Sequence, residues 1–335
     1  MSRGRIERLT IDSAALRGNP LGDPPVRELP VYLPPGYDAG GRFPVIWNLT
    51  GFTGFGAMQL NRAGWGEGMD QRLDRLIGAD DCPPVIMALP DCFTRLGGSQ
   101  YLDSTATGAY ETHLIEELVP AVDRALRTRA AAAHRGVLGK SSGGYGALVQ
   151  AMRHPEVFSA VACHSGDLAF EHCYLPDFAA VVRAVDKAGS LAKWLVGFEA
   201  APRKTHDHLQ VMNILAMSAC YSPNPAKAPP FAFDLPFDLA TGALDEAVWS
   251  RWLAWDPVRM LDQARPAEAL RRLRLVFLDC GKKDEFRLDL GARIFAAKLR
   301  ALGIAHEHEE FDDGHMSITY RYDVSVPKLA RVLAA

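Results

Sequence analysis

The segment from residue 137 to 147, VLGKSSGGYGA, constrains the fold of this chain more than any other stretch. A short apolar run stops at Gly139, two serines follow, and further glycines lead into a stretch of helical character. This is the pattern G-x-S-x-G, in which a strained strand-to-helix turn lifts the central serine clear of a sheet. Small residues are needed at Gly139 and Gly143 because strand and helix approach closely there. The pattern makes Ser141 the candidate nucleophile and places a backbone N–H group of Ser142 at the helix start.

Two other interpretations of this turn are open. Gly139-Lys140-Ser141 resembles the end of a phosphate-binding P-loop, which occupies the same strand-to-helix position. That motif requires a further glycine five residues before Gly139, where His134 stands, so a nucleotide site is disfavoured. The remaining interpretation is a glycine-rich turn that serves only packing.

Composition narrows the class of partner. The 335 residues carry a net charge of −3 without a block of like charges, which argues against nucleic acid or an anionic membrane surface. No segment approaches the roughly 18 apolar residues of a membrane span, and the N-terminus has no apolar run behind its charges. The six cysteines lack C-x-x-C spacing, which favours reduced thiols over disulfides or zinc. We therefore expect a cytoplasmic protein that acts on a small molecule, with Cys92 as a thiol that could line its site.

Strand and helix patterns alternate along most of the chain. Residues 6–11 and 26–33 predict an antiparallel hairpin at a sheet edge. Apolar runs typical of strands follow at 43–49, 84–89, 135–138, 158–164 and 273–279, and residues 306–311 are predicted as the last strand. Helices are predicted over 69–77, 110–127 and 288–302, and after residue 316. This alternation predicts an α/β fold with a mostly parallel sheet covered by helices on both faces.

The regular alternation lapses between Ser165 and about Leu270. Helical pieces there are separated by proline-rich stretches, and the segment holds four of the six tryptophans. A segment of this length between two core strands is an insertion, which we predict to be a helical cap over the site. The predicted division is a core of residues 1–166 and 271–335 and a cap of residues 167–270. A peripheral helical decoration is the alternative; as part of a pocket, the tryptophans would suit an apolar or aromatic substrate group.

A serine hydroxyl needs an imidazole to take its proton and a carboxylate to hold that imidazole in the right tautomer. In the α/β-hydrolase arrangement the order is Ser, an acid after a late strand, then His after the last strand. Asp284 follows the strand near residues 275–278, and His315 lies in a Gly-His turn after the final strand. Asp279 and Glu285 are alternative acids.

Two backbone N–H groups should stabilise the oxyanion that forms when a carbonyl is attacked. One is that of Ser142, and the other should come from the loop after the strand at 45–49, where Phe52 is the first choice and Thr53 the second. The histidine pairs His306/His308 and His206/His208 lack a third metal ligand at a sensible spacing. His164 could point into the pocket or be structural.

On these motifs the chain resembles the Putative esterase (esterase D-like) family of α/β-hydrolases. That family includes S-formylglutathione hydrolases, feruloyl and acetylxylan esterases, enterochelin esterases and mycolyltransferases. The matching residues are 139–147, Asp91 with 97–99, Tyr110-Glu111 with 117–120, 164–166, 279–281 with 284–286, and Gly314-His315. The resemblance implies Ser141 as nucleophile, Asp284 as acid and His315 as base. Ser142 stands where the family often has Met, and the loop 48–52 lacks the His before Gly found in many members.

The sequence thus predicts an α/β-hydrolase fold and a serine hydrolase that cleaves carboxylic esters through an acyl-enzyme intermediate. The expected partner is a small-molecule ester, and neither metal nor organic cofactor is expected. The alternatives are an acyltransferase with the same triad and a non-catalytic binding protein on the same fold. The specific ester and the oligomeric state, including a homo-oligomer, are open.

Overall fold

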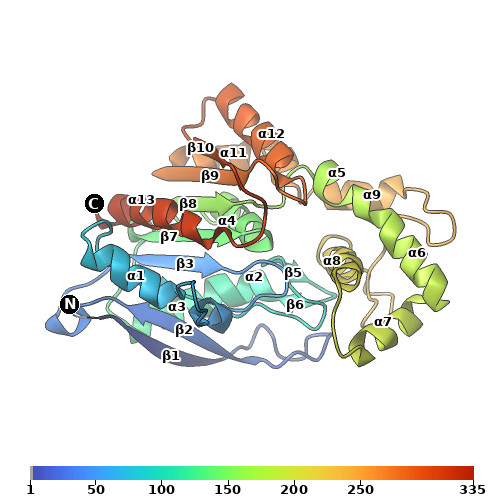
Figure 1. Ribbon diagram of the computed structural model, residues 1–335, viewed down its shortest axis with the longest axis horizontal. Helices are drawn as coiled ribbons and strands as arrows, with labels where there is room; N and C mark the ends of the chain where they lie inside the picture. The colour runs from blue at the N-terminus through green and yellow to red at the C-terminus, as the bar shows by residue number, and fades with distance from the viewer. Residues whose placement is uncertain (1–2) are drawn as a thin grey trace.

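The computed structural model describes residues 3–335 and is built around one eight-stranded sheet with the order β1-β2-β4-β3-β7-β8-β9-β10 (Figure 1). Its strands are β1 Arg5–Asp12, β2 Val26–Leu33, β3 Val45–Leu49, β4 Ile86–Ala88, β7 Arg135–Lys140, β8 Ala160–His164, β9 Leu275–Gly281 and β10 Glu307–Phe311. β1 pairs with β2, and β2 with β4, in antiparallel register, whereas the pairs from β4 to β10 are parallel. The predicted edge hairpin and mostly parallel sheet are confirmed.

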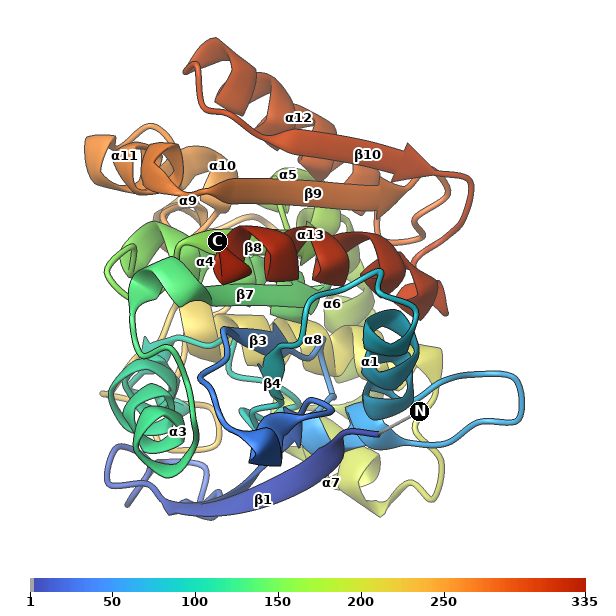
Figure 2. The same cartoon turned by 90° about the vertical axis from the view of Figure 1, so that its left-hand side faces the viewer.

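Helices cover both faces of the sheet. One face carries α1 Met69–Gly78 and α13 Tyr322–Ala334, which lie in front of the strands in Figure 2. The other carries α2 Tyr110–Thr112, a π-helical turn His113–Leu118, α3 Val119–Ala125, α4 Ser142–Arg153 and α12 Leu288–Ala301. Neighbouring residues of β3 serve the two faces in turn: Trp47 belongs to the core cluster on the α4 side and Ile46 to the one under α1 and α13. This alternation is the period-two pattern of a strand buried on both sides.

The chain between β8 and β9 is helical. It contains α5 Phe170–Cys173, a 3₁₀ turn Leu175–Asp177, α6 Phe178–Ala188, α7 Leu191–Ala200, α8 His206–Tyr221, α9 Glu246–Leu253, α10 Pro257–Met260 and α11 Ala264–Arg272. In Figure 1 most of it lies beyond the carboxyl ends of β3 and β7. The division into core and cap at residues 167–270 stays a prediction, since α11 spans its C-terminal boundary and packs against α4.

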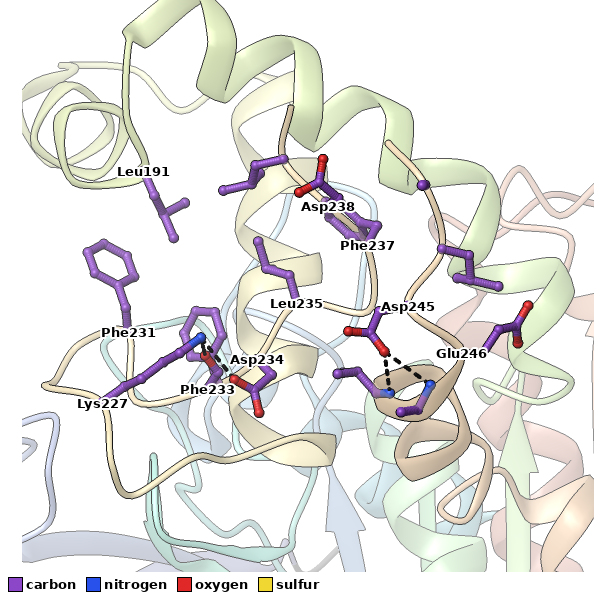
Figure 3. Close-up of a pocket in the computed structure, with 15 residues that line it drawn as sticks. Leu191, Lys227, Phe231, Phe233, Asp234, Leu235, Phe237, Asp238, Asp245 and Glu246 are labelled. Carbon is purple, nitrogen blue, oxygen red and sulfur yellow. Dashed lines mark hydrogen bonds and ion pairs between the residues drawn. The ribbon is translucent and has the colours of Figure 1, made fainter. Parts of the chain in front are cut away.

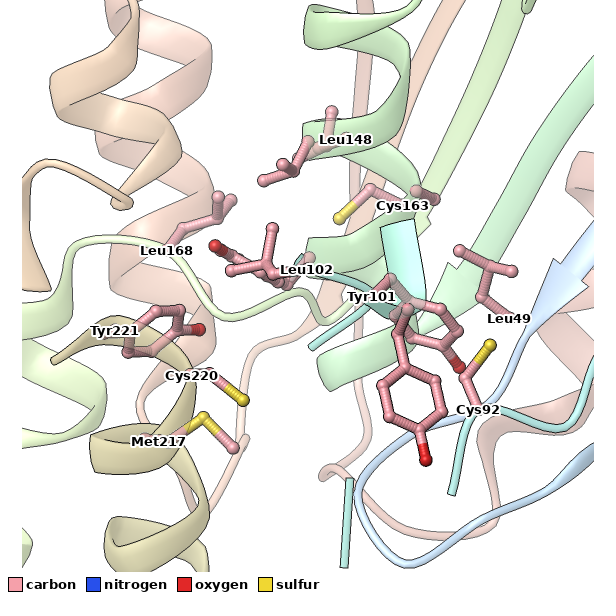
Figure 4. Close-up of a cluster of buried hydrophobic side chains, with 14 of the residues drawn as sticks. Leu49, Cys92, Tyr101, Leu102, Leu148, Cys163, Leu168, Met217, Cys220 and Tyr221 are labelled. Atoms are coloured by element: carbon pink, nitrogen blue, oxygen red, sulfur yellow. The ribbon is translucent and has the colours of Figure 1, made fainter. Parts of the chain in front are cut away.

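Side chains of this helical segment share a buried cluster with the sheet domain. Leu148 on α4, Met217, Cys220 and Tyr221 on α8, and the stretch Tyr101-Leu102 converge there (Figure 4). α8 is therefore held against the residues that follow β4, close to the edge where the parallel strands end.

Three tryptophans of the helical segment are packed in its interior. Trp252 is fully buried, and Trp194 and Trp249 are nearly so. The ring of Phe178 lies edge-on to those of Trp249 and Trp252, with centroids 5.6 and 5.8 Å apart. These indoles stabilise the helical segment, so the idea that they form an aromatic wall open to substrate is not supported.

A pair of two-residue strands, β5 Asp103–Ser104 and β6 Gly108–Ala109, shapes the long loop after β4.

Within residues 3–335, no helix combines the length and the apolar character that crossing a membrane requires.

Candidate active site

Ser141 occupies the sharp turn between β7 and α4. Its backbone has φ 58° and ψ −127°, a conformation that is strained for any residue with a side chain. A Cβ added at Gly139 would overlap the carbonyl of Gly143, and one at Gly143 would overlap the carbonyl of Leu49. The strand, the turn and the helix therefore approach as closely as the glycine pattern predicts.

His315 and Asp284 lie together at the same edge of the sheet. Nδ1 of His315 lies 2.8 Å from Oδ2 of Asp284, and both side chains are buried. The other oxygen, Oδ1 of Asp284, accepts the backbone N–H groups of Phe286 at 2.9 Å and Leu288 at 3.4 Å. The carboxylate is thus fixed from one side and holds the imidazole from the other.

Opposing effects act on the charge of Asp284. Burial on its own would raise the pKa of this carboxyl, but the hydrogen bond and charge of His315, together with backbone N–H groups, bring its pKa below the usual 3.8. The carboxylate is therefore ionised at neutral pH, as it must be to accept the proton on Nδ1.

The two other candidate acids have different partners. Oδ1 of Asp279 lies 2.6 Å from Nδ1 of His164, and Oδ2 accepts Nε of Arg321 at 2.8 Å. Glu285 accepts the backbone N–H of His315 at 2.7 Å and so positions the main chain of the turn. Of the three carboxylates, the one that reaches the imidazole of His315 is Asp284, and His164 is structural.

The loop after β3 lies against Ser141. A Cβ placed on Gly51 would come within 3.2 Å of Cβ and 3.9 Å of Oγ of Ser141. The N–H of Thr53 donates to the carbonyl of Gly97 at 2.7 Å and is therefore occupied. Among residues 3–335, no acceptor takes the N–H of Phe52, which favours Phe52 over Thr53 as the second oxyanion donor. Ser142 is the first residue of α4, where the N–H group has no partner within the helix.

The structure brings His315 and Asp284 into contact but forms no hydrogen bond from Oγ of Ser141 to any group in residues 3–335. In enzymes without substrate, bonds between nucleophile and base are often long. The catalytic roles of Ser141, His315 and Asp284, and the oxyanion roles of Ser142 and Phe52, stay predictions.

Other residues considered from the sequence lie elsewhere. Nδ1 of His306 lies 2.8 Å from the carbonyl of Ile304, and His208 belongs to the N-terminal cap of α8 with Thr205. Across the described chain, no three His, Cys, Asp or Glu side chains are grouped as a metal site requires. All six cysteines are buried free thiols, and burial raises the pKa of Cys92 well above its usual value.

The sequence did not predict a role for Asp167, which lies beside Ser142. Asp167, three residues after β8, accepts hydrogen bonds on Oδ2 from Ser142 Oγ at 3.1 Å and from Tyr174 at 2.8 Å. The only sequence signal for it is a carboxylate shortly after the carboxyl end of a parallel strand.

A separate cavity of about 910 Å³ lies within the helical segment (Figure 3). It is lined by apolar side chains including Leu191, Phe231 and Phe237, with Asp234 paired to Lys227 at its rim. None of the predicted catalytic residues lines it, so the cavity and the candidate active site are distinct.

Comparison with known proteins gives a consistent result. A model of the family described as "Putative esterase" matches residues 26–323. No curated protein sequence matches the chain. Among solved structures, a ferulic acid esterase has a TM-score of 0.64 at 18% identity, covering 99% of this chain and 100% of its own.

Two further solved structures resemble the chain over nearly its full length. An S-formylglutathione hydrolase from Agrobacterium tumefaciens has a TM-score of 0.61 at 16% identity, covering 99% of this chain and 97% of its own. A fluorophosphonate-binding serine hydrolase of Staphylococcus aureus, with substrate bound, has a TM-score of 0.61 at 13% identity and covers 99% of both chains. At these identities the likeness establishes the α/β-hydrolase fold that the sequence predicted.

Proposed function

Since the chain belongs to the Putative esterase family, we propose that it is a serine hydrolase of small carboxylic esters that works through an acyl-enzyme intermediate. The observation that carries the proposal is the 2.8 Å hydrogen bond between His315 and Asp284, at the sheet edge where Ser141 holds a strained turn. A buried carboxylate on Nδ1 leaves Nε2 of the neutral imidazole free to accept a proton.

In the first half of the proposed reaction, Oγ of Ser141 attacks the ester carbonyl carbon and its proton passes to Nε2 of His315. The N–H groups of Ser142 and Phe52 donate to the resulting oxyanion. When the tetrahedral intermediate collapses, the C–O bond to the alcohol breaks and the alcohol leaves with the proton from His315. In the second half, His315 takes a proton from the water that attacks the acyl carbon. The bond from that carbon to Oγ of Ser141 then breaks, the acid is released, and His315 returns the proton to Oγ.

Contacts of the helical segment with residues beside Ser141 support a role for this segment at the same site. Tyr174 and Tyr221, from the chain between β8 and β9, reach the buried cluster around Asp167 beside Ser142. We infer that residues 167–270 act as a cap that shapes the substrate site. The six free thiols support a reducing compartment, and a cytoplasmic location is part of the proposal.

The test compares wild type with Ser141→Ala on p-nitrophenyl acetate and butyrate. The substitution should lower kcat on the order of 10⁴-fold or more with folding intact. A fluorophosphonate should label wild type in a 1:1 ratio and leave Ser141→Ala unlabelled. Undiminished activity of Ser141→Ala would refute the assignment, and absence of labelling in wild type would favour a binding protein.

Product analysis separates hydrolysis from acyl transfer. With a short alcohol added, a hydrolase yields mainly the free acid, whereas an acyltransferase yields mainly the new ester. A screen of aryl, alkyl and sugar esters would then define the substrate class.

A further inference from the structure

A buried polar cluster lies next to the nucleophile and is not used by the proposed reaction. Oδ2 of Asp167 accepts three hydrogen bonds, from Ser142 Oγ at 3.1 Å, Tyr174 Oη at 2.8 Å and Gln100 Nε2 at 3.2 Å. Nε2 of Gln100 also donates to Tyr221 at 2.8 Å. The cluster joins the turn after β7, the loop after β4 and the helical segment.

Two oxygens of the cluster have no partner in residues 3–335. Gln100 is 1% exposed, and its Oε1 atom is completely buried but accepts no hydrogen bond. Oδ1 of Asp167 also accepts none, and it is not among the completely buried orphaned atoms, so the 6% exposure of Asp167 includes this oxygen. A structural link between segments would need only the bonds to Oδ2. A purely structural role therefore does not explain why Oδ1 of Asp167 has no hydrogen-bond donor.

The charge of Asp167 is also incompletely balanced. No Lys or Arg in the described chain forms an ion pair with it; its three donors are neutral. Burial raises the pKa of Asp167, and the bonds from Tyr174 and Gln100 and the charge of His315 oppose that rise. The bond from Ser142, the residue that follows Ser141, places Asp167 beside the proposed nucleophile. A buried carboxylate gains from a cation that donates a hydrogen bond to it.

We propose that Asp167 is a specificity-determining residue that binds a protonated amine of the ester substrate through Oδ1. The inference rests on the proposed esterase function and names its substrate class: esters with an ammonium N–H group a few bonds from the carbonyl. An ester without this group offers no donor to Oδ1, and a site built around a polar group discriminates strongly against ligands that leave it unpaired.

Isosteric ester pairs test the proposal with the amine on either side of the scissile bond. On the acyl side, β-alanine methyl ester is compared with methyl butyrate, and methyl 3-hydroxypropanoate provides a neutral donor. On the alcohol side, protonated 2-(dimethylamino)ethyl acetate is compared with 3-methylbutyl acetate. Hydrolysis is followed by titration of the released acid, and each pair gives a ratio of kcat/KM for cationic over neutral ester.

The decisive variant is Asp167→Asn. Its amide oxygen can still accept from Ser142, Tyr174 and Gln100, which turns the amide N–H₂ toward the position of Oδ1 and replaces an acceptor by a donor. The cationic-to-neutral ratio should then fall about tenfold or more in at least one series, because a buried polar partner is left unpaired. Comparing the ratio between enzymes cancels the different intrinsic reactivity of the esters.

Asp256→Asn is the matched control. Asp256 is also a buried carboxylate in the helical segment, but its oxygens accept backbone N–H groups of Ala169, Phe170 and Val258. Its substitution should leave the ratio within about twofold of wild type, since no substrate group meets it. A ratio unchanged in Asp167→Asn in both series overturns the proposal, as does a loss confined to the hydroxy ester.

Binding measurements cover the remaining outcomes. If Asp167→Asn does not fold, inhibition of wild type by n-butylammonium is compared with inhibition by n-butanol, and equal inhibition overturns the proposal. If wild type cleaves no ester, the proposed function fails by itself. Binding of n-butylammonium to wild type and Asp167→Asn, followed by ligand NMR, then decides the cation site, with a tenfold loss expected and equal affinity overturning it.

Discussion

The imidazole of His164 lies 2.6 Å from Asp279 and, through its other nitrogen, 2.8 Å from Oγ of Ser325. The chain therefore contains a second histidine placed between a carboxylate and a serine. His164 and Asp279 are each 1% exposed and Ser325 is fully buried, so substrate cannot reach them. This set joins β8, β9 and α13 and shows that the residue types of a triad do not make an active site without access.

Substitution of the two aspartates should separate catalysis from stability. Asp284→Asn removes the acceptor that fixes the tautomer of His315, so kcat should fall about 10⁴-fold while the fold persists. Asp279→Asn leaves Arg321 and His164 without their shared buried carboxylate, which should cost about 3–5 kcal/mol of unfolding free energy. Ester hydrolysis and urea unfolding of both variants check this, and a reversed pattern would exchange the two roles.

The glycines of the strand-to-helix turn should be intolerant of even one methyl group. In Gly143→Ala the new Cβ overlaps the backbone carbonyl of Leu49, which belongs to a central strand and cannot move aside. We expect a loss of about 3 kcal/mol of stability and of most activity. Gly197→Ala is the control, because nothing lies within 4 Å of its Cβ in α7. It should gain about 0.5–1 kcal/mol, and equal melting temperatures for the two variants would contradict the steric argument.

The sequence predicts the turn at Ser141 because that pattern is local: glycine spacing, a preceding strand and a following helix lie within a few residues. It leaves three candidate acids because Asp279, Asp284 and Glu285 occupy one strand end and its turn. Which of them reaches His315 depends on the turn after Gly281, whose carbonyl accepts the N–H of Asp284 at 3.2 Å.

Long-range contacts could not be predicted in the same way. Asp167 accepts a hydrogen bond from Gln100, which is 67 residues away in sequence, and Gln100 donates to Tyr221, which is 121 residues away. No local sequence spacing therefore predicts the cluster. Composition alone also cannot distinguish a tryptophan that lines a pocket from one such as Trp252 that is fully buried.

Backbone strain at Ser141 should be measurable as stability. A residue with a Cβ pays for φ 58° and ψ −127°, whereas glycine adopts positive φ freely. Ser141→Gly should therefore be about 1 kcal/mol more stable than Ser141→Ala, although both lack the nucleophile. Thermal unfolding of the two inactive variants measures the difference. A Ser141→Gly protein less stable than Ser141→Ala would mean that the flexibility of glycine in the unfolded chain outweighs the strain.

The charge of Asp167 should make stability depend on pH in a defined direction. Its pKa in the folded protein is raised above 3.8, first by burial, so between the unfolded and folded values the folded state binds more protons. The free energy of unfolding therefore falls as pH rises through that window, and the contribution is fully lost above the folded pKa. Asp167→Asn lacks this dependence, while Asp256 and the other carboxylates remain common to both proteins. Urea unfolding from about pH 4 to about pH 7 should show the variant gaining stability relative to wild type as pH rises. If the difference in unfolding free energy between the two proteins stays constant, or if wild type gains stability relative to the variant, the three hydrogen bonds on Oδ2 fully offset the burial of the charge. The carboxylate would then gain nothing further from binding a cation.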